Sequence, residues 1–175
     1  VHDKLRKTTV NEEEKILYFK ERDETTRDEI RMITSLFVFS ENLDVLIAKR
    51  HFSKKLNPNL WGPAVAGTVD EGFDYDSTIL KEAEEEIGLL NIKPIFYKKI
   101  FYETSNARRF NSIYYVVINK EENKLVIQED EVSEIKWLSL DELDNRFKEK
   151  PEEFIPSFKR DLDYTKDIYE KLSKE

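Results

Sequence analysis

The sequence predicts a mixed α/β or α+β fold, in which strand-forming stretches lie on both sides of one central helix. Runs of β-branched and aromatic residues at 32–40 and 110–118 are typical of strands. Between them, residues 76–87 repeat apolar side chains at helical spacing. The chain has 175 residues, of which 39% are hydrophobic, so we expect a single domain over 1–175 with a real core. Periodicity alone does not choose between the two fold classes.

Composition excludes several classes of function. The net charge of -8 argues against an extended nucleic-acid surface, which requires a basic stripe, but it leaves room for a local basic pocket. The absence of cysteine excludes disulfides, thiolate metal sites and cysteine nucleophiles. No apolar run approaches the ~20 residues of a membrane span, and no signal-peptide pattern begins the sequence. We therefore expect a cytoplasmic protein without a membrane segment.

The first third of the chain predicts an extension followed by a hairpin. Residues 1–11 are polar, and we expect them to be loosely ordered. The short apolar run at 16–20 predicts a strand or one turn of helix, and 21–31 reads as a charged connector. The strand at 32–40, a turn and a return strand at 45–49 then form a hairpin.

A cationic cluster comes after this hairpin. Lys49, Arg50, Lys54 and Lys55 surround His51 in the sequence. We interpret the cluster as a positive rim that attracts a phosphate-bearing substrate, because Arg can bind phosphate through two hydrogen bonds at once. A solvated loop is the alternative. Trp61, further on, is expected to be a structural anchor.

The chain is organised around the loop and helix of residues 67–89, GTVDEGFDYDSTILKEAEEEIGL. We place the helix start near Asp76 or Ser77, which are both good N-cap types, and its end at Gly88. One stripe of this helix is predicted to face the core: Ile79, Leu80, Ala83 and Ile87.

A neighbouring face of the same helix gathers carboxylates from Glu82, Glu85 and Glu86. Like charges one turn apart destabilise a helix, and no Lys or Arg lies one turn away on that face. We therefore expect positive charge from outside the helix, and clustered carboxylates suit Mg²⁺ or Mn²⁺. A solvated acidic face is the alternative that periodicity leaves open.

Two further strands are predicted at 95–103 and 110–118, joined by a connection at 104–109. Four residues at this end of the pair are pocket candidates, although the sequence does not show which way they point: Tyr102, Glu103, Arg108 and Arg109. A strand at 135–138 comes after an acidic segment that includes Glu131 and Glu134.

The C-terminal part predicts two helices. Ser139 and Glu142 fit a capping box, and Pro151 and Pro156 separate the helix that begins there from the last one. The last helix carries one largely apolar stripe: Phe158, Leu162, Thr165, Tyr169 and Leu172. This stripe is expected to pack on the domain, with a dimer seam as the alternative, so the protein is a monomer or a homodimer.

The loop and helix resemble the Nudix box, the signature of MutT-like Nudix hydrolases. Six positions match this pattern: Gly67, Glu82, Glu85, Glu86, Gly88 and Leu89. Two positions depart from it, since Phe73 stands in place of Glu and Lys81 in place of Arg. The flanking stretches NLWGPAVAG and QEDEVSEIKWLSLDEL also look like this family, and the resemblance covers residues 32–147. It is nearest to the branch similar to isopentenyl-diphosphate isomerase and its hydrolase relatives.

The resemblance implies an α/β/α sandwich, with a mixed β-sheet between helices. It implies an extension over residues 1–30, a Nudix core over 31–150 that contains the box at 67–89, and a C-terminal helix within 151–175. The implied activity is hydrolysis of a diphosphate linked to another group X, so the expected partner is a small-molecule diphosphate.

The resemblance also implies roles for individual residues. Glu82, Glu85 and Glu86 would be catalytic and bind the metal, with the Gly67 carbonyl as a further ligand. An additional carboxylate outside the box would come from Glu131 or Glu134, although a solvated loop is equally open there. Three cations are the substrate-binding candidates: Arg50, Lys55 and Arg109.

The two departures keep a second function open. A Glu–Arg pairing replaced by apolar packing of Phe73 would preserve activity, whereas decay of the site would leave a Nudix fold that binds a nucleotide or partner without turnover. Isomerase chemistry is not expected. The catalytic Cys and His that such enzymes carry around the box glycine are replaced here by Ala66 and Thr68.

Overall fold

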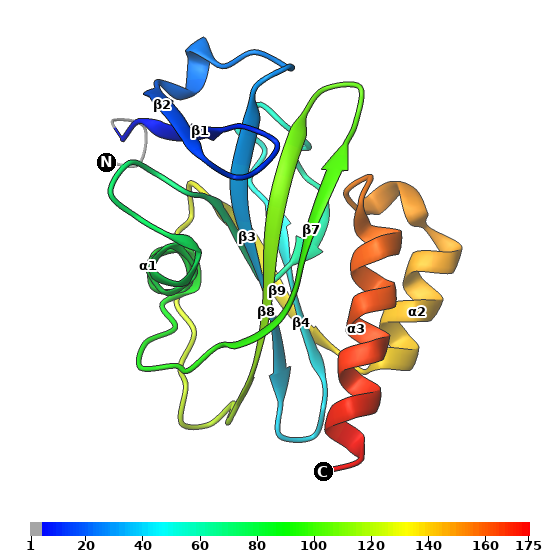
Figure 1. Cartoon of the computed structure of the whole chain (residues 1–175). Helices are drawn as coiled ribbons and strands as arrows, with labels where there is room; N and C mark the ends of the chain where they lie inside the picture. The colour runs from blue at the N-terminus through cyan, green and yellow to red at the C-terminus, as the bar shows by residue number, and fades with distance from the viewer. Residues whose placement is uncertain (1–4) are drawn as a thin grey trace.

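The computed structural model describes residues 5–175 as one nine-stranded mixed sheet between helices. Helix α1 (Tyr75–Ile87) lies on one face of the sheet, and α2 (Leu140–Glu149) and α3 (Phe158–Ser173) lie on the other (Figure 1). This arrangement confirms the expected fold class. The division into extension, core and C-terminal helix stays a prediction.

The remaining elements are strands and two short 3-10 turns. The strands are β1 (Lys7–Val10), β2 (Ile16–Lys20), β3 (Ile30–Ser40), β4 (Val45–Arg50), β5 (Trp61–Pro63), β6 (Val65–Thr68), β7 (Ile95–Glu103), β8 (Arg108–Ile118) and β9 (Val132–Leu138). The turns are η2 (Arg22–Glu24) and η3 (Pro151–Glu153).

Strand β3 organises the sheet because it pairs with four neighbours. It runs parallel to β8 from the pair Ile30–Arg108 to the pair Ser40–Ile118. It pairs antiparallel with β1, β4 and β6, and β6 brings Gly67 next to Thr34. The box glycine is therefore fixed to the central strand, close to the helix that comes after it.

Alternation along β3 produces two cores. Leu36 and Val38 face α1, whose buried residues include Ile79 and Ile87. Phe37, on the opposite face, belongs to the core covered by α2 and α3. Trp61 is fully buried in that second core, which confirms its expected structural role.

The N-terminal segment differs from its prediction. Residues 7–10 form a fully buried strand that lies between β2 and β3, whereas the sequence predicts loose order for 1–11. The first four residues of that range lie outside the described part of the chain. The apolar run at 16–20 is a strand, as one of the two alternatives predicts. Polar residues form β1 because its backbone pairs on both sides.

The C-terminal helix packs on the sheet. Phe158, Leu162 and Ile168 of α3 are buried in the second core, and Tyr169 and Leu172 pack against it. The apolar stripe is thus used within the chain, and the oligomeric state stays a prediction. None of the described helices combines the length and apolar character that crossing a bilayer requires.

Candidate active site

Helix α1, which carries the acids of the Nudix-box resemblance, begins two residues earlier than predicted. Asp74 is its N-cap, since the Asp74 carboxylate accepts a hydrogen bond from the Ser77 backbone at 2.8 Å and Ser77 Oγ accepts one from Asp74 N–H at 3.0 Å. The hydrogen bonds from Ser77 lower the pKa of the Asp74 carboxyl. Gly88 ends the helix at φ +67°, as predicted. Ser77 therefore completes the cap rather than starting the helix.

Burial along α1 corrects the predicted stripe. Leu80 is 44% exposed, although its spacing predicts a place in the core, and Glu82 is only 7% exposed. A Cβ atom at Gly67 would lie 2.4 Å from Glu82 Cγ, closer than real contacts allow. The missing side chain of Gly67 is therefore what lets the Glu82 carboxylate fit against β6. Helix α1 thus buries Glu82 and exposes Leu80, although its periodicity predicts that Leu80 is the buried residue.

Glu82 and Glu86 form a pair of adjacent acids, of which Glu82 is buried and Glu86 half-buried. Burial is the largest cause that raises the pKa of Glu86 well above its usual range, followed by the negative charges of Glu82 and Glu131. A hydrogen bond between the two side chains acts in the same direction, and one from the backbone N–H of Ala66 opposes it. We call these two residues the acid pair. Without a cation, the acid pair favours holding a proton.

Glu85 is turned toward Lys81 instead of joining the acid pair. Lys81 Nζ lies 3.7 Å from Glu85 Oε2 and 3.4 Å from Glu82 Oε1. The expected cation from outside the helix is thus replaced in part by Lys81, four residues before Glu85. Burial lowers the pKa of Lys81, but the charges of Glu82, Glu85 and Asp70 outweigh it and raise the pKa.

The predicted three-acid metal cluster is not assembled. Among residues 5–175, no group of three or more His, Cys, Asp or Glu side chains is gathered in a geometry that could hold a metal ion. The acid pair still presents hard carboxylate oxygens whose negative charge is disfavoured by burial, and such oxygens suit Mg²⁺ or Mn²⁺. The donor set therefore fits a divalent cation through Glu82 and Glu86, with Glu85 differently engaged.

The two departures from the box motif lie against each other. Lys81 Nζ is 5.2 Å from the Phe73 ring centre, within the range of a cation–π contact. Lys81 also lies 3.4 Å from Asp70 Oδ2. The Phe73–Lys81 contact and the Asp70 carboxylate together fasten the loop to the helix. Phe73 is 37% exposed, so it contacts Lys81 through its ring face and is not packed in an apolar core, and both alternatives for the two departures stay predictions.

Asp70 is held from a second side by the N-terminal extension. Lys7 of β1 forms a buried ion pair with Asp70, and the two residues also form a β-bridge. The ion pairs of Asp70 with Lys7 and with Lys81 therefore connect β1 to α1. Sequence reasoning missed Lys7, because an isolated Lys in a polar segment has no signal that marks it as buried.

The cationic cluster after β4 divides among different partners. Lys54 forms an ion pair with Glu131, and Lys55 forms a highly exposed one with Asp23 at 2.7 Å. Arg50 Nε donates to the Leu56 carbonyl at 3.0 Å. Burial lowers the pKa of Arg50, while the charges of Glu86 and Glu131 act in the opposite direction. Arg50 is therefore the member of the predicted rim on which the charge of Glu86 acts, while Lys54 is paired with Glu131.

The strand-end candidates separate onto two faces. Tyr102 and Arg109 are registered partners, as are Glu103 and Arg108. Because successive side chains of a strand point to opposite faces, Tyr102 and Arg109 share one face and Glu103 and Arg108 share the other. Glu134 is paired with Lys136 at 3.8 Å. Thus Glu131, rather than Glu134, is the acid outside the box that contributes to the electrostatics of Glu86.

Comparison with known proteins identifies the family of this chain. A sequence model of the NUDIX domain matches residues 29–158. The Escherichia coli K12 protein described as an uncharacterized Nudix hydrolase, YfcD, is 25% identical over 148 residues, which are 84% of this chain and 78% of that protein.

Solved structures show the same fold. The crystal structure of DR0079 from Deinococcus radiodurans has a TM-score of 0.73 at 19% identity and covers 93% of this chain and 98% of that one. A binary complex of the C. elegans Ap4A hydrolase has a TM-score of 0.63 at 16% identity and covers 83% and 99%. The branch similar to isopentenyl-diphosphate isomerase stays a prediction.

Proposed function

The chain belongs to the Nudix family of hydrolases that act on phosphoric anhydrides, and we propose that it cleaves the diphosphate linkage of a nucleotide-type or other small diphosphate–X compound with Mg²⁺. The observation that carries this proposal is the acid pair, with Glu82 buried against Gly67 and Glu86 half-buried beside it. Two adjacent carboxylates with little exposure to water repel each other, and Lys81 offsets this only in part from the side of Glu82. A divalent cation held by both carboxylates would offset the remaining repulsion.

The residues divide the reaction among themselves. Glu82 and Glu86 would hold the metal, with the Gly67 carbonyl as a further oxygen. When bound, Mg²⁺ supplies charge neutralisation at the phosphoryl oxygens and a more acidic water. One carboxylate of the acid pair would accept the proton of the attacking water. Arg50, which already lies within electrostatic reach of Glu86, would contact a phosphoryl oxygen.

A nucleotide-type substrate has support from one of the structural neighbours. The C. elegans protein is described as an Ap4A hydrolase, crystallised as a binary complex. We propose the broader class of diphosphate–X compounds for this chain. Mn²⁺ would serve the same oxygen ligands.

A second candidate is a Nudix fold that binds such compounds without turnover. Two observations favour it: Glu85 is engaged with Lys81, and no three-acid cluster is found among the described residues. The two candidates predict that the chain binds the same compounds. They differ in whether the bound compound is hydrolysed.

The test is a panel of diphosphate compounds incubated with the full chain, with and without Mg²⁺. Glu86→Gln is expected to lower kcat on the order of 10³-fold, because it removes a metal ligand and a charge. Glu84→Gln is the matched control, since Glu84 is an exposed neighbour on the same helix. Release of no product from any compound would refute the hydrolase and leave the binder.

A further inference from the structure

One line of residues crosses five strands of the sheet in register. Thr9 of β1 pairs with Tyr18 of β2 and with Arg31 of β3. Arg31 pairs with Arg109 of β8, and Arg109 pairs with Tyr102 of β7. Registered partners point to the same face of a sheet. We call this line the arginine row: Tyr18, Thr9, Arg31, Arg109 and Tyr102.

The row lies on the sheet face that α2 and α3 cover further along the strands. Arg31 is an even number of residues from Phe37, which belongs to the core beneath α3, so both point the same way. Arg160, in the first turn of α3, stacks on the Tyr102 ring at 4.2 Å. The N-terminal end of α3 therefore borders the row.

The row is rich in buried donors whose hydrogen-bonding needs are not met. Arg31 is 9% exposed, and its Nη2 reaches Glu29 at 3.3 Å, but its Nη1 is buried without a hydrogen-bond partner. The same is true of Thr9 Oγ1 and of Arg160 Nε. Arg31 thus has one ion-pair partner, Glu29, whereas the Arg109 guanidinium has none within residues 5–175. A buried donor without an acceptor destabilises the fold, so a cluster of such donors indicates an acceptor that binds there.

Positive charge accumulates around the row and extends toward the acid pair. Burial lowers the pKa of Arg31, the charges of Glu29 and Tyr18 oppose this shift, and the charges of Arg22 and Arg109 lower the pKa further. Burial also lowers the pKa of Arg50, on which Arg109 and Arg22 act in the same direction. The charge of Glu86 also acts on Arg50. Arg50 therefore interacts electrostatically with both the arginine row and the acid pair.

We propose that the arginine row binds a second anionic group, a phosphate or carboxylate carried on group X of the diphosphate substrate. The inference rests on the proposed hydrolase and narrows its substrates to compounds that carry an anion in addition to the scissile diphosphate. Two adjacent guanidinium groups offer parallel forks of donors to such an anion. Compounds with a neutral X would leave these donors unpaired.

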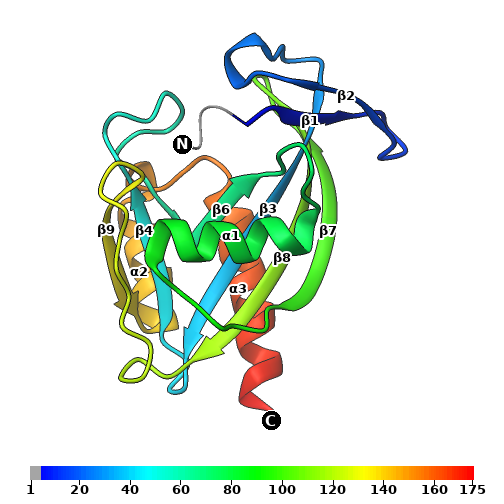
Figure 2. The same cartoon turned by 90° about the vertical axis from the view of Figure 1, so that its left-hand side faces the viewer.

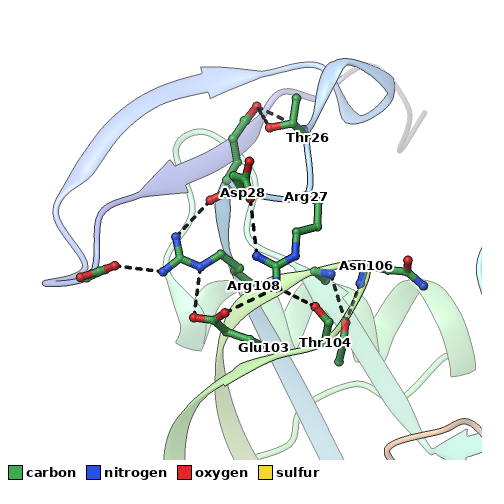
Figure 3. A network of polar contacts seen from close by, with 10 residues as sticks. Thr26, Arg27, Asp28, Glu103, Thr104, Asn106 and Arg108 are labelled. Carbon is green, nitrogen blue, oxygen red and sulfur yellow. Dashed lines mark hydrogen bonds and ion pairs between the residues drawn. The ribbon is translucent and has the colours of Figure 1, made fainter.

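The neighbouring residue Arg108 provides a matched control. It lies one position from Arg109 but points to the opposite face, where its Nη2 pairs with Glu12 at 2.9 Å and its Nε with Glu103 at 3.3 Å (Figure 3). Its Nη1 donates to the Asp28 carbonyl at 3.2 Å. Ion pairs whose partners are solvent-exposed contribute little to stability, so Arg108→Gln is expected to fold and to leave the row intact.

The experiment measures binding by calorimetry to the full chain without metal, so that turnover does not interfere. ADP-ribose is compared with ADP-ribose 1″-phosphate, whose extra phosphate is on the terminal ribose, and UDP-glucose with UDP-glucuronate, so that phosphate and carboxylate recognition are tested separately. Wild type is expected to bind one charged member about tenfold more tightly than its neutral counterpart. Arg31→Gln and Arg109→Gln should reduce that preference to below about twofold, and Arg108→Gln should keep it.

Two results would overturn the inference. One is equal affinity for both members of each pair in wild type, and the other is an equal loss of preference in Arg108→Gln and Arg109→Gln. A parallel Mg²⁺ assay separates this failure from failure of the hydrolase. Hydrolysis without preference for the extra anion would retain the proposed function and refute the row. Preference without hydrolysis of any compound would refute both the hydrolase and the row's role in selecting its substrates.

Discussion

The acid pair and the arginine row are two groups of like charge that the fold assembles differently. Glu82 and Glu86 are four residues apart on α1, which crosses one face of the sheet (Figure 2). The arginine row takes one residue from each of five strands. Each group has one ion-pair partner of opposite charge among the described residues, Lys81 beside Glu82 and Glu29 beside Arg31. The difference teaches that a charged site within one helix is visible in a sequence, whereas a site across a sheet depends on strand register.

Placing a methyl group at Gly67 is the strongest way to break the acid side of this comparison. Gly67→Ala would put Cβ 2.4 Å from Glu82 Cγ, so the acid pair must separate. We expect kcat to fall on the order of 10²–10³-fold and the free energy of unfolding to fall by about 1–3 kcal/mol. Steady-state kinetics and thermal unfolding check this, with Thr68→Ala as the control. Activity near wild type would show that the Glu82 position does not matter.

Removing Lys7 tests how much a buried ion pair contributes to stability, compared with removing an arginine that has no ion pair among the described residues. Lys7→Met leaves Asp70 buried with only Lys81, at 3.4 Å, as its remaining cation. The free energy of unfolding is expected to fall by about 3 kcal/mol, because breaking a buried ion pair strands one charge. Arg109→Gln, which removes an arginine without an ion-pair partner among the described residues, should not lower it. Equal denaturant midpoints for wild type and Lys7→Met would remove the proposed role of the extension.

Asp161 offers a third buried charge, with a pH dependence of predictable sign. Burial raises the pKa of this carboxyl to about 6, although Arg160 opposes the rise. The folded state therefore holds the proton more tightly than the unfolded state, and stability falls as pH rises from about 4 to 6. Asp161→Asn is expected to gain about 2–3 kcal/mol above pH 6 and to lose this dependence. Unfolding measured at pH 5 and pH 8 tests it, and a larger gain at pH 5 would contradict the sign.

The smallest expected effect concerns the exposed Phe73. Phe73→Leu removes the cation–π contact with Lys81 and should lower the free energy of unfolding by about 0.5–1 kcal/mol. Phe73→Glu restores the family residue but places another carboxylate beside Lys81, which already contacts Asp70, Glu82 and Glu85. We expect it to lower kcat more than Phe73→Leu does. A rise in kcat for Phe73→Glu would contradict this expectation and would indicate that the Phe present at position 73 weakens the site.

Much of the fold can be predicted because local patterns agree with it. The strands around 32–49 and 95–118, the capping box at Ser139 and the stripe of α3 are all visible in composition and spacing. The predicted start of α1 is two residues late, because Ser77 and Asp74 are both good caps and only their mutual hydrogen bonds decide between them. Spacing also predicts Leu80 in the core, where Glu82 is buried instead.

The candidate site is predictable in part. Motif spacing identifies Gly67 and the acids, but it does not reveal that Glu85 turns to Lys81 or that Lys7 reaches Asp70. The second of these contacts depends on side chains brought together over a long separation in the sequence. The orientation of Arg109 emerges only from its register with Arg31 and Tyr102.

The position of β1 sets a limit on shortening the chain. The NUDIX match begins at residue 29, but β1, which pairs with β3, lies before that residue. Cutting the chain at that boundary would uncover a strand edge, which invites association between molecules, and would delete the lysine that neutralises Asp70. Expression of the matched region alone should therefore give an aggregation-prone protein, even though every residue of the signature would still be present.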